Sequence, residues 1–314
     1  MTDQINYTPD HEALVSRIME LKTKRNAVFL CHNYQRPEVQ DIADVLGDSL
    51  ALAQQASDLD CEVIVFCGVH FMAESAAMLS PEKTVLLPRL DAGCPMADMV
   101  TADALKLRKK ELGDVPVVCY INSSAAVKAE SSICCTSGNA IRVVESVDAD
   151  RVLFVPDRNL GAYIQRFTKK DVVLWDGYCN THDRLTSQDI QTARELHPRA
   201  KVVVHPECTP EVIDIADGVR STSGMISWSR EVDRDEIIVG TEGGMVHRLE
   251  KEVPEKKFYL ASRKLVCPAM KLTSLQSILF ALENMNPRIT VDDETGKFAI
   301  EALNKMLAVP RDIP

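Results

Sequence analysis

The chain alternates between short apolar runs and longer stretches with apolar residues at helical spacing. The apolar runs are rich in valine and isoleucine, and they include AVFLCH, VPVVCY and AKVVVH. Between such runs lie stretches like PEVQDIADVLGDSLALAQQAS and TPEVIDIADGV, whose spacing predicts helices. Uniformly apolar strands that alternate with helices are typical of parallel sheets covered on both faces. The pattern therefore predicts an α/β fold.

The apolar runs also belong to an internal repeat. When the ends of the three runs are aligned, His32, Tyr120 and His205 fall in register, at intervals of 88 (120 − 32) and 85 (205 − 120) residues. A second and a third apolar strand follow in each repeat, which predicts three pseudo-symmetric αβα units with parallel sheets around a central active site. The predicted units cover residues 1–100, 101–190 and 191–284, with the C-terminal segment 285–314 as a candidate addition to the first.

Each repeat carries a small hydroxyl cluster and ends its third strand in a cysteine. The hydroxyls occur in GDSL, CTSGN and RSTSGM, and the cysteines are 85 (179 − 94) and 88 (267 − 179) residues apart. In parallel sheets, ligands bind beyond the carboxyl ends of the strands. We therefore expect both sets to face one cavity: Ser49, Ser137 and Thr222 as hydroxyls, and Cys94, Cys179 and Cys267 as thiols.

Three converging thiolates suit two kinds of metal centre. Zinc takes a fourth protein ligand in structural sites and keeps an open position in catalytic sites. A [4Fe–4S] cluster is normally held by four cysteines, so three would leave one iron free to act as a Lewis acid. The wide spacing of Cys94, Cys179 and Cys267 favours a functional site over a structural one, and His182 is a candidate fourth ligand or hydrogen-bonding neighbour.

Polar residues at the strand ends indicate acid–base chemistry. His205 and Glu207 are two residues apart, so both face the same side of an extended strand. His32 with Tyr34, and Tyr120 with Asn122, repeat this spacing. A histidine and a carboxylate beside a metal can act as general acid and base. The simpler alternatives are a structural His–Glu hydrogen bond and, for the hydroxyl clusters, ordinary helix capping.

Composition narrows the class of protein. The 314 residues are 46% apolar and 26% charged, as in a globular protein, and a net charge of −10 argues against binding to nucleic acid or an acidic membrane. The polar start, MTDQINYTPDHE, lacks a signal-peptide pattern, and no apolar run approaches the roughly 20 residues of a membrane span. We expect a cytoplasmic protein, whose ten cysteines form no disulfide framework. A regulatory disulfide involving Cys134 and Cys135 is a weaker hypothesis.

The motifs taken in order resemble the quinolinate synthase family, iron–sulfur enzymes of bacterial and archaeal NAD biosynthesis. The resemblance runs from about residue 30 to about residue 275, and its specificity lies in the ordered set. Ser123 and Ser132 depart mildly from the family pattern, which affects the expected positioning of substrate. The matching stretches are CHNYQRPEVQDIADVLGDSL, DAGCPMADM, YINSSAAVKAE, CCTSGNA, GYCNTH, HPEC, STSGMI, GTEGGM and CPAMK.

The resemblance implies a specific reaction and specific roles. It implies a [4Fe–4S] cluster on Cys94, Cys179 and Cys267, and condensation of iminosuccinate with dihydroxyacetone phosphate to quinolinate, phosphate and water. An aspartate oxidase or dehydrogenase is the implied supplier of the imine. Substrate-binding positions fall on His32, Ser49, Tyr120, Asn122, Ser137, His205, Glu207 and Thr222. The candidates for catalysis are Tyr34, Tyr120, Glu207 and His182.

Two other functions remain open at this point. An aconitase-like hydro-lyase would use the same open iron on a different substrate, so that only a substrate test separates the two. A zinc-stabilised scaffold or metabolite-binding module without turnover would need the cysteines but no iron.

Overall fold

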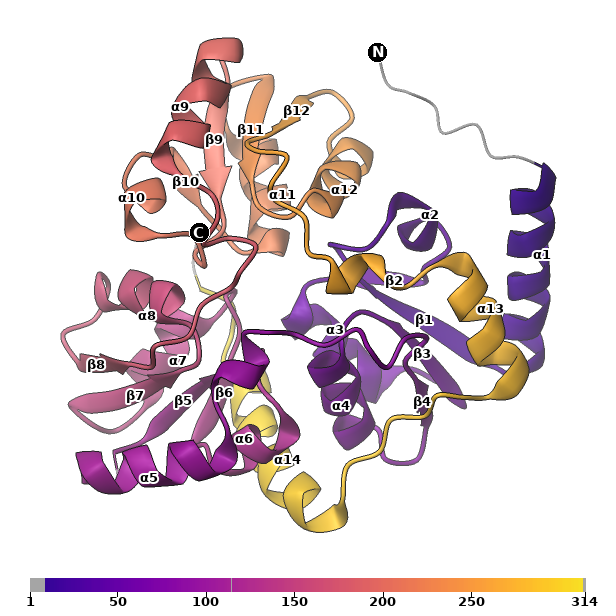
Figure 1. Ribbon diagram of the computed structural model, residues 1–314, viewed down its shortest axis with the longest axis horizontal. Helices are drawn as coiled ribbons and strands as arrows, with labels where there is room; N and C mark the ends of the chain where they lie inside the picture. Colours follow the sequence, from indigo (N-terminus) through magenta and orange to yellow (C-terminus); the bar gives the residue numbers. More distant parts are fainter. Residues whose placement is uncertain (1–8, 114, 313–314) are drawn as a thin grey trace.

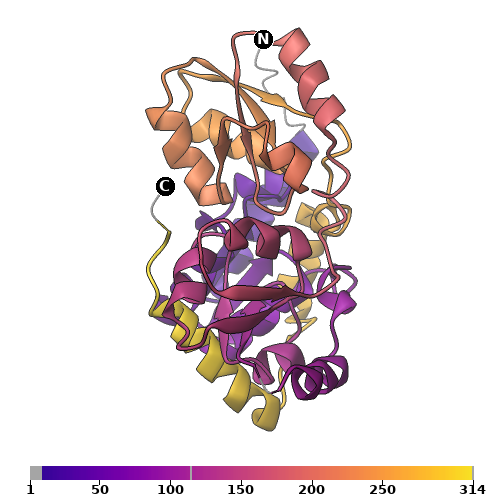
Figure 2. The same ribbon diagram turned by 90° about the vertical axis from the view of Figure 1, so that its left-hand side faces the viewer.

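Three parallel four-stranded sheets form the centres of three units in the computed structural model, which describes residues 9–113 and 115–312 (Figure 1). The strand order is the same in every sheet, with the first strand of each unit between the second and the third. Figure 2 shows the third unit stacked above the other two. The predicted α/β fold with three αβα units is confirmed.

The strands of the three sheets occupy equivalent positions in the three sequence repeats. The first sheet contains β1 (Ala27–His32), β2 (Val45–Gly47), β3 (Val63–Cys67) and β4 (Thr84–Leu86). The second contains β5 (Val117–Tyr120), β6 (Ile133–Cys135), β7 (Arg151–Val155) and β8 (Asp171–Leu174). The third contains β9 (Lys201–Val204), β10 (Gly218–Val219), β11 (Glu236–Gly240) and β12 (Lys257–Leu260).

Helices cover the faces of the sheets. The first unit has α1 (Pro9–Lys24), α2 (Pro37–Gln40), α3 (Ser49–Asp58) and α4 (His70–Leu79). The second has the 3₁₀ helix η1 (Ala97–Met99), α5 (Ala102–Leu112), α6 (Ala125–Ala129), α7 (Ala140–Ser146) and α8 (Arg158–Gln165). The third has α9 (Ser187–Leu196), α10 (Pro210–Ile213), α11 (Thr222–Glu231) and α12 (Gly244–Glu252), and the chain ends with η2 (Ala269–Lys271), α13 (Leu275–Asn284) and α14 (Asp293–Leu307).

The prediction of helix throughout the stretch 37–57 was wrong. The structure breaks it into α2, the edge strand β2 and α3, and it breaks residues 209–219 into α10 and β10. The edge strand forms because Val45, Leu46 and Gly47 pair with the end of β1. A strand of two or three residues is too short to show a period of its own, so the helical spacing on either side hides it. These edge strands lead directly to the hydroxyl clusters.

The described part of the C-terminal segment, residues 285–312, is shared between two units. Residues 288 and 289 join the edge of the first sheet, where Leu86 and Arg288 form an antiparallel bridge and the Ile289 N–H donates to the Val85 carbonyl at 2.9 Å. Helix α14 then packs mainly on α6 and β6 of the second unit, not on the first unit as expected. The predicted unit boundaries stay a prediction, and their ends at residues 1–8 and 313–314 lie outside the described residues.

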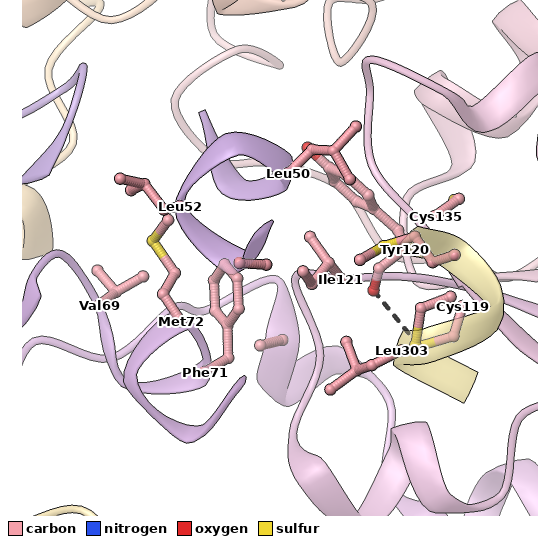
Figure 3. Packing of buried hydrophobic residues seen from close by; sticks show 14 of the residues in the cluster. Leu50, Leu52, Val69, Phe71, Met72, Cys119, Tyr120, Ile121, Cys135 and Leu303 are labelled. Atoms are coloured by element: carbon pink, nitrogen blue, oxygen red, sulfur yellow. Dashed lines mark hydrogen bonds between the residues drawn. The ribbon is translucent and has the colours of Figure 1, made fainter. Parts of the chain in front are cut away.

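A continuous apolar core joins the first two units. Figure 3 shows Leu50 of α3, Phe71 of α4, Tyr120 of β5 and Leu303 of α14 pointing into one packed region. Leu303 is 0% exposed, so α14 closes the core that lies behind the strand ends of the second unit. The same core continues into the third unit through Met225 and neighbouring residues.

We expect Leu303→Ala to lower the free energy of unfolding by about 2–5 kcal/mol, because it leaves a cavity in a close-packed core. Phe298→Ala on the same helix should cost much less, since Phe298 is 48% exposed. Urea unfolding followed by circular dichroism measures both. Equal losses for the two variants would show that α14 does not close the core.

No helix in residues 9–113 and 115–312 is long and apolar enough to cross a membrane. The polar residues at the start of the chain, which carry part of the cytoplasmic expectation, fall largely within residues 1–8 and so outside the described structure. The cytoplasmic location therefore stays a prediction.

Candidate active site

A cavity of about 480 Å³ lies where the strand ends of the three units meet. Every candidate residue from the sequence lines it, because the repeat places equivalent strand ends around one centre. The lining set is His32, Tyr34, Ser49 and Cys94 from the first unit; Tyr120, Asn122, Ser137, Cys179 and His182 from the second; and His205, Glu207, Thr222 and Cys267 from the third.

Three cysteines differ from the other seven in exposure. All ten lie within the described residues, and Cys94, Cys179 and Cys267 are partly exposed toward the cavity, whereas the rest are buried. Burial raises the pKa of Cys94 to about 12, and the charges of Cys267 and Glu207 add smaller increases. Burial also raises the pKa of Cys179 and of Cys267. Such thiols become thiolates when a cation binds them.

Cys94 and Cys267 occupy matching turns. Each is followed by a proline and then by a 3₁₀ helix, η1 or η2. In both turns the main-chain N–H groups two and three residues after the cysteine lower the pKa of its thiol, against the effect of burial. The repeated Cys-Pro pair therefore builds the same cradle of N–H groups twice, which suits a sulfur that carries negative charge.

Glu207 is the centre of a buried hydrogen-bond network. The Tyr120 hydroxyl donates to its Oε1 at 2.5 Å, and His182 Nδ1 lies 2.6 Å from its Oε2. Burial opposes ionisation of this carboxyl, but His205, His182 and the Tyr120 hydroxyl together lower the pKa of Glu207. Glu207 is therefore ionised at neutral pH.

Tyr34 joins this network through Thr241. Its hydroxyl lies 2.6 Å from Thr241 Oγ1, which is in turn 2.8 Å from His182 Nε2. Burial and the charge of Glu207 raise the pKa of Tyr34 and of Tyr120 well above the ordinary tyrosine value, so both hydroxyls keep their protons. Tyr34, Thr241, His182, Glu207 and Tyr120 therefore form one continuous series of polar contacts beside the cavity.

His32 and His205 adopt the same local geometry in two repeats. His32 Nδ1 accepts the Tyr34 N–H at 3.2 Å, and His205 Nδ1 accepts the Glu207 N–H at 3.3 Å. Each ring therefore carries its proton on Nε2, and His205 Nε2 lies 3.2 Å from Ser137 Oγ. Burial lowers the pKa of His32 to about 4 and that of His205 to about 3. Both rings are neutral donors at physiological pH.

The lowered pKa of His32 predicts a loss of stability in acid. The unfolded chain takes up a proton near pH 6.5, whereas the folded chain takes it up only near pH 4, so stability falls as pH drops through this window. One such group accounts for roughly 3 kcal/mol across the window. His32→Gln should flatten the fall of the melting temperature between pH 6.5 and pH 4.5, measured by scanning calorimetry. An unchanged slope would mean that His32 titrates normally.

The hydroxyl residues lie at the starts of helices. Ser49 and Thr222 are the first residues of α3 and α11, and Ser137 lies three residues before α7. The N-terminal ends of helices carry free N–H groups and a partial positive charge, which favour carboxylate or phosphate. Asn122 Oδ1 is buried without a hydrogen-bond partner in the described chain, so a ligand in the cavity could satisfy it.

Cys179, His182 and Glu207 also lie close together, with ligand atoms within 4.8 Å of one another. This group fits a hydrogen-bonded set better than a metal site. His182 Nδ1 and Glu207 Oε2 are 2.6 Å apart, whereas two ligands of one zinc ion at about 2.0–2.1 Å each would stand roughly 3.3 Å apart. His182 Nδ1 lies 3.2 Å from Cys179 Sγ, so His182 contacts Cys179 as a neighbour.

Sequence reasoning missed a buried ion pair that supports Cys267. Glu242 is 0% exposed and accepts the Cys267 N–H at 3.2 Å, while Lys271 Nζ lies 3.0 Å from its carboxylate. Lys271 also donates to the Tyr34 carbonyl at 2.6 Å, so the pair ties the third unit to the first beside the cavity. The motif GTEGGM at the end of β11 carried the signal, because its glutamate lies two residues after the end of a strand.

The fold and the site together define a class: α/β proteins in which three repeated units build one cavity from three thiols, three hydroxyls and a buried acid–base network.

A family model described as quinolinate synthetase A protein matches residues 16–308. The chain is 56% identical over 301 residues to the quinolinate synthase of Geobacter sp. (strain M21), covering 96% of this chain and 99% of that protein. Quinolinate synthase 1 of Methanosarcina acetivorans is 54% identical over 296 residues, covering 94% and 97%.

The chain therefore belongs to the quinolinate synthase family, as the ordered motifs predicted, and it is an enzyme. The name of the family places it in NAD biosynthesis. A solved reductase, the E-1-hydroxy-2-methyl-but-2-enyl-4-diphosphate reductase of Plasmodium falciparum, aligns with a TM-score of 0.32 and 12% identity over 90% of this chain and 97% of that one.

Proposed function

We propose that this enzyme condenses iminosuccinate with dihydroxyacetone phosphate to give quinolinate, phosphate and water, with a [4Fe–4S] cluster held by Cys94, Cys179 and Cys267. One observation carries the proposal: three partly exposed cysteines at equivalent places in three repeats line the same cavity as the Glu207 network. The overall reaction joins a ketone and an imine and releases one phosphate and two water molecules, so its atoms balance without an oxidant or a reductant.

The spacing of the sulfurs fits a cluster better than a single ion. Three thiolates on one zinc ion would stand about 3.8 Å apart, given a Zn–S distance of about 2.3 Å. Among the described residues, the sulfurs of Cys94, Cys179 and Cys267 are not all within 4.8 Å of one another, so at least one pair stands further apart than two ligands of a single zinc ion would. When bound, a cluster with three protein ligands would supply an iron that acts as a Lewis acid.

The remaining polar groups suit the proposed substrates, which are a dicarboxylate and a phosphate ester. The starts of α3 and α11 offer N–H groups and the hydroxyls of Ser49 and Thr222 to anionic oxygens. The neutral rings of His32 and His205 add Nε2–H donors for carboxylates. These groups allow an acidic protein to hold small anions inside its cavity.

Proton transfer falls to the network around Glu207. Loss of water requires a base for a C–H or N–H proton and an acid for the departing hydroxyl. Glu207 is ionised and accepts protons, while Tyr120, hydrogen-bonded to it, and Tyr34, linked through Thr241 and His182, donate them. The buried position of these groups excludes bulk water from the exchange.

The substrate test separates this proposal from a hydro-lyase. The anaerobically purified enzyme is supplied with dihydroxyacetone phosphate and with iminosuccinate generated in place by an aspartate oxidase acting on L-aspartate. We expect quinolinate and phosphate to appear in equal amounts, with neither formed when dihydroxyacetone phosphate is omitted. Dehydration of a hydroxycarboxylic acid such as citrate, without formation of quinolinate, would favour the aconitase-like alternative.

The imine substrate also implies a supplying reaction. Iminosuccinate hydrolyses readily in water, so an enzyme that oxidises aspartate must produce it close to this one. We infer a functional link to an aspartate oxidase or dehydrogenase. In the assay above, the added aspartate oxidase performs the role of this supplying enzyme.

A further inference from the structure

The C-terminal end of the described chain contacts two of the three helix starts that supply hydroxyls to the cavity, those of α3 and α7, and lies beside the third, that of α11. We call residues 308–312, which follow α14, the C-terminal strap. Figures 1 and 2 both show this part of the chain rising from α14 along the junction between the second and third units. The strap itself does not line the cavity, so any influence on ligands acts through its neighbours.

Arg311 forms a paired contact with the residue before Ser49. Its Nη1 and Nη2 lie 2.6 Å and 2.8 Å from the two carboxylate oxygens of Asp48. Asp48 is the N-cap of α3, where its Oδ1 accepts the Ala51 N–H at 2.9 Å. Burial would raise the pKa of Asp48, but the hydrogen bonds and charge of Arg311, with hydrogen bonds from Ala51 and Ser223, hold it below its ordinary value.

Asp312 contacts the helix that follows Ser137. Its carboxylate accepts the N–H groups of Ile141 and Arg142 at 3.1 Å and 2.9 Å, and its own N–H donates to the Gly138 carbonyl at 2.7 Å. Asn139, the residue at the N-cap position of α7, makes no capping hydrogen bond with its side chain. The strap therefore caps α7 from outside.

Arg311 also lies where the second and third units meet. A methyl group at position 138 would stand 2.8 Å from Arg311 Nη1 and 3.5 Å from Ser221 Oγ, so the glycine leaves the space through which the guanidinium passes. Ser221 is the N-cap of α11, directly before Thr222. One arginine thus borders the starts of α3, α7 and α11.

From this geometry we propose that Arg311 and Asp312 are positioning residues, which hold Ser49, Ser137 and Thr222 in the arrangement that binds the anionic groups of the substrates. A charge-assisted, paired hydrogen bond to a buried carboxylate fixes orientation as well as distance. The proposal rests on the proposed function for the identity of the ligands, whereas the positioning itself can be measured without any substrate.

The first test is hydrogen–deuterium exchange of the anaerobically purified enzyme, read by mass spectrometry. Arg311→Ala should raise exchange in peptides that contain the starts of α3, α7 and α11, and Gly138→Ala should raise it at the start of α3 by displacing the guanidinium. The control is Arg166→Ala, which removes a 2.7 Å contact to Asp214 between the second and third units. Arg166 and Arg311 have equally exposed side chains, each at 38%. Increased exchange confined to the strap would overturn the proposal.

The second test is kinetic. Arg311→Ala should raise KM for dihydroxyacetone phosphate roughly tenfold with a smaller change in kcat, because the groups it orients bind substrate and transition state alike. Arg311→Lys, which keeps the charge but loses the paired contact, should recover part of that loss, and Arg166→Ala should leave both constants unchanged. An unchanged KM in Arg311→Ala would overturn the positioning role. Absence of quinolinate from the unmodified enzyme would instead refute the proposed function, and the exchange measurement would still decide the role of the strap.

Discussion

Glu207→Gln should reduce kcat for quinolinate formation by about 10²–10⁴-fold while leaving the iron content and visible spectrum of the enzyme unchanged. The amide keeps the size of the side chain and can still hydrogen-bond to Tyr120 and His182. It cannot accept a proton, however, and the ionised oxygen between those two residues is lost. Steady-state kinetics and metal analysis on the same preparation measure both quantities.

Glu211→Gln provides the matched control for that substitution. Glu211 lies four residues further along, in the first turn of α10, and is exposed, so the same chemical change there should alter neither turnover nor iron content. If Glu207→Gln retained full turnover, proton transfer would have to run through other residues. If it lost iron together with activity, Glu207 would be acting as a ligand.

Cys179→Ser should remove the metal centre itself. Serine offers a weaker ligand for iron, so the variant should contain little iron or acid-labile sulfide after anaerobic purification, and quinolinate formation should fall below detection. The effect should exceed that of Glu207→Gln, because in the proposed mechanism the Lewis-acidic iron would be lost together with its third thiolate ligand. Iron and sulfide assays with a visible spectrum measure the loss.

Cys61→Ser is the control for the cysteine substitution. Cys61 precedes β3, is 8% exposed and does not line the cavity, so its replacement should leave iron and sulfide at the level of the unmodified enzyme. A Cys179→Ser variant that kept its full iron content would remove Cys179 from the ligand set. Equal losses in both variants would indicate general instability in place of a ligand role.

The sequence allowed the fold class and the cavity to be predicted because both depend on the repeat. Buried parallel strands read as uninterrupted apolar runs, and residues at their ends must meet if the units are equivalent. His32 and His205 illustrate this, since each accepts the N–H two residues ahead of it in the same way. Cys94 and Cys267 likewise lie in matching turns, each followed by a proline and a 3₁₀ helix.

Other features depend on contacts between distant segments and left no local pattern. Glu242 and Lys271 pair across 29 residues, and Asp48 and Arg311 across 263 residues. Each partner alone reads as an ordinary charged residue, and only the packing of the units brings them together. The edge strands β2, β6 and β10 escaped prediction for a different reason, because two or three residues show no period.

In the proposed mechanism, three thiols from three repeated units hold one iron–sulfur cluster beside a proton-transfer network. The most direct measurement is the iron and acid-labile sulfide content of the enzyme purified without oxygen, together with its visible spectrum. We expect close to four iron and four sulfide per chain, as in a [4Fe–4S] centre, and a broad brown absorbance. A colourless protein that contains zinc, or no metal at all, would contradict it.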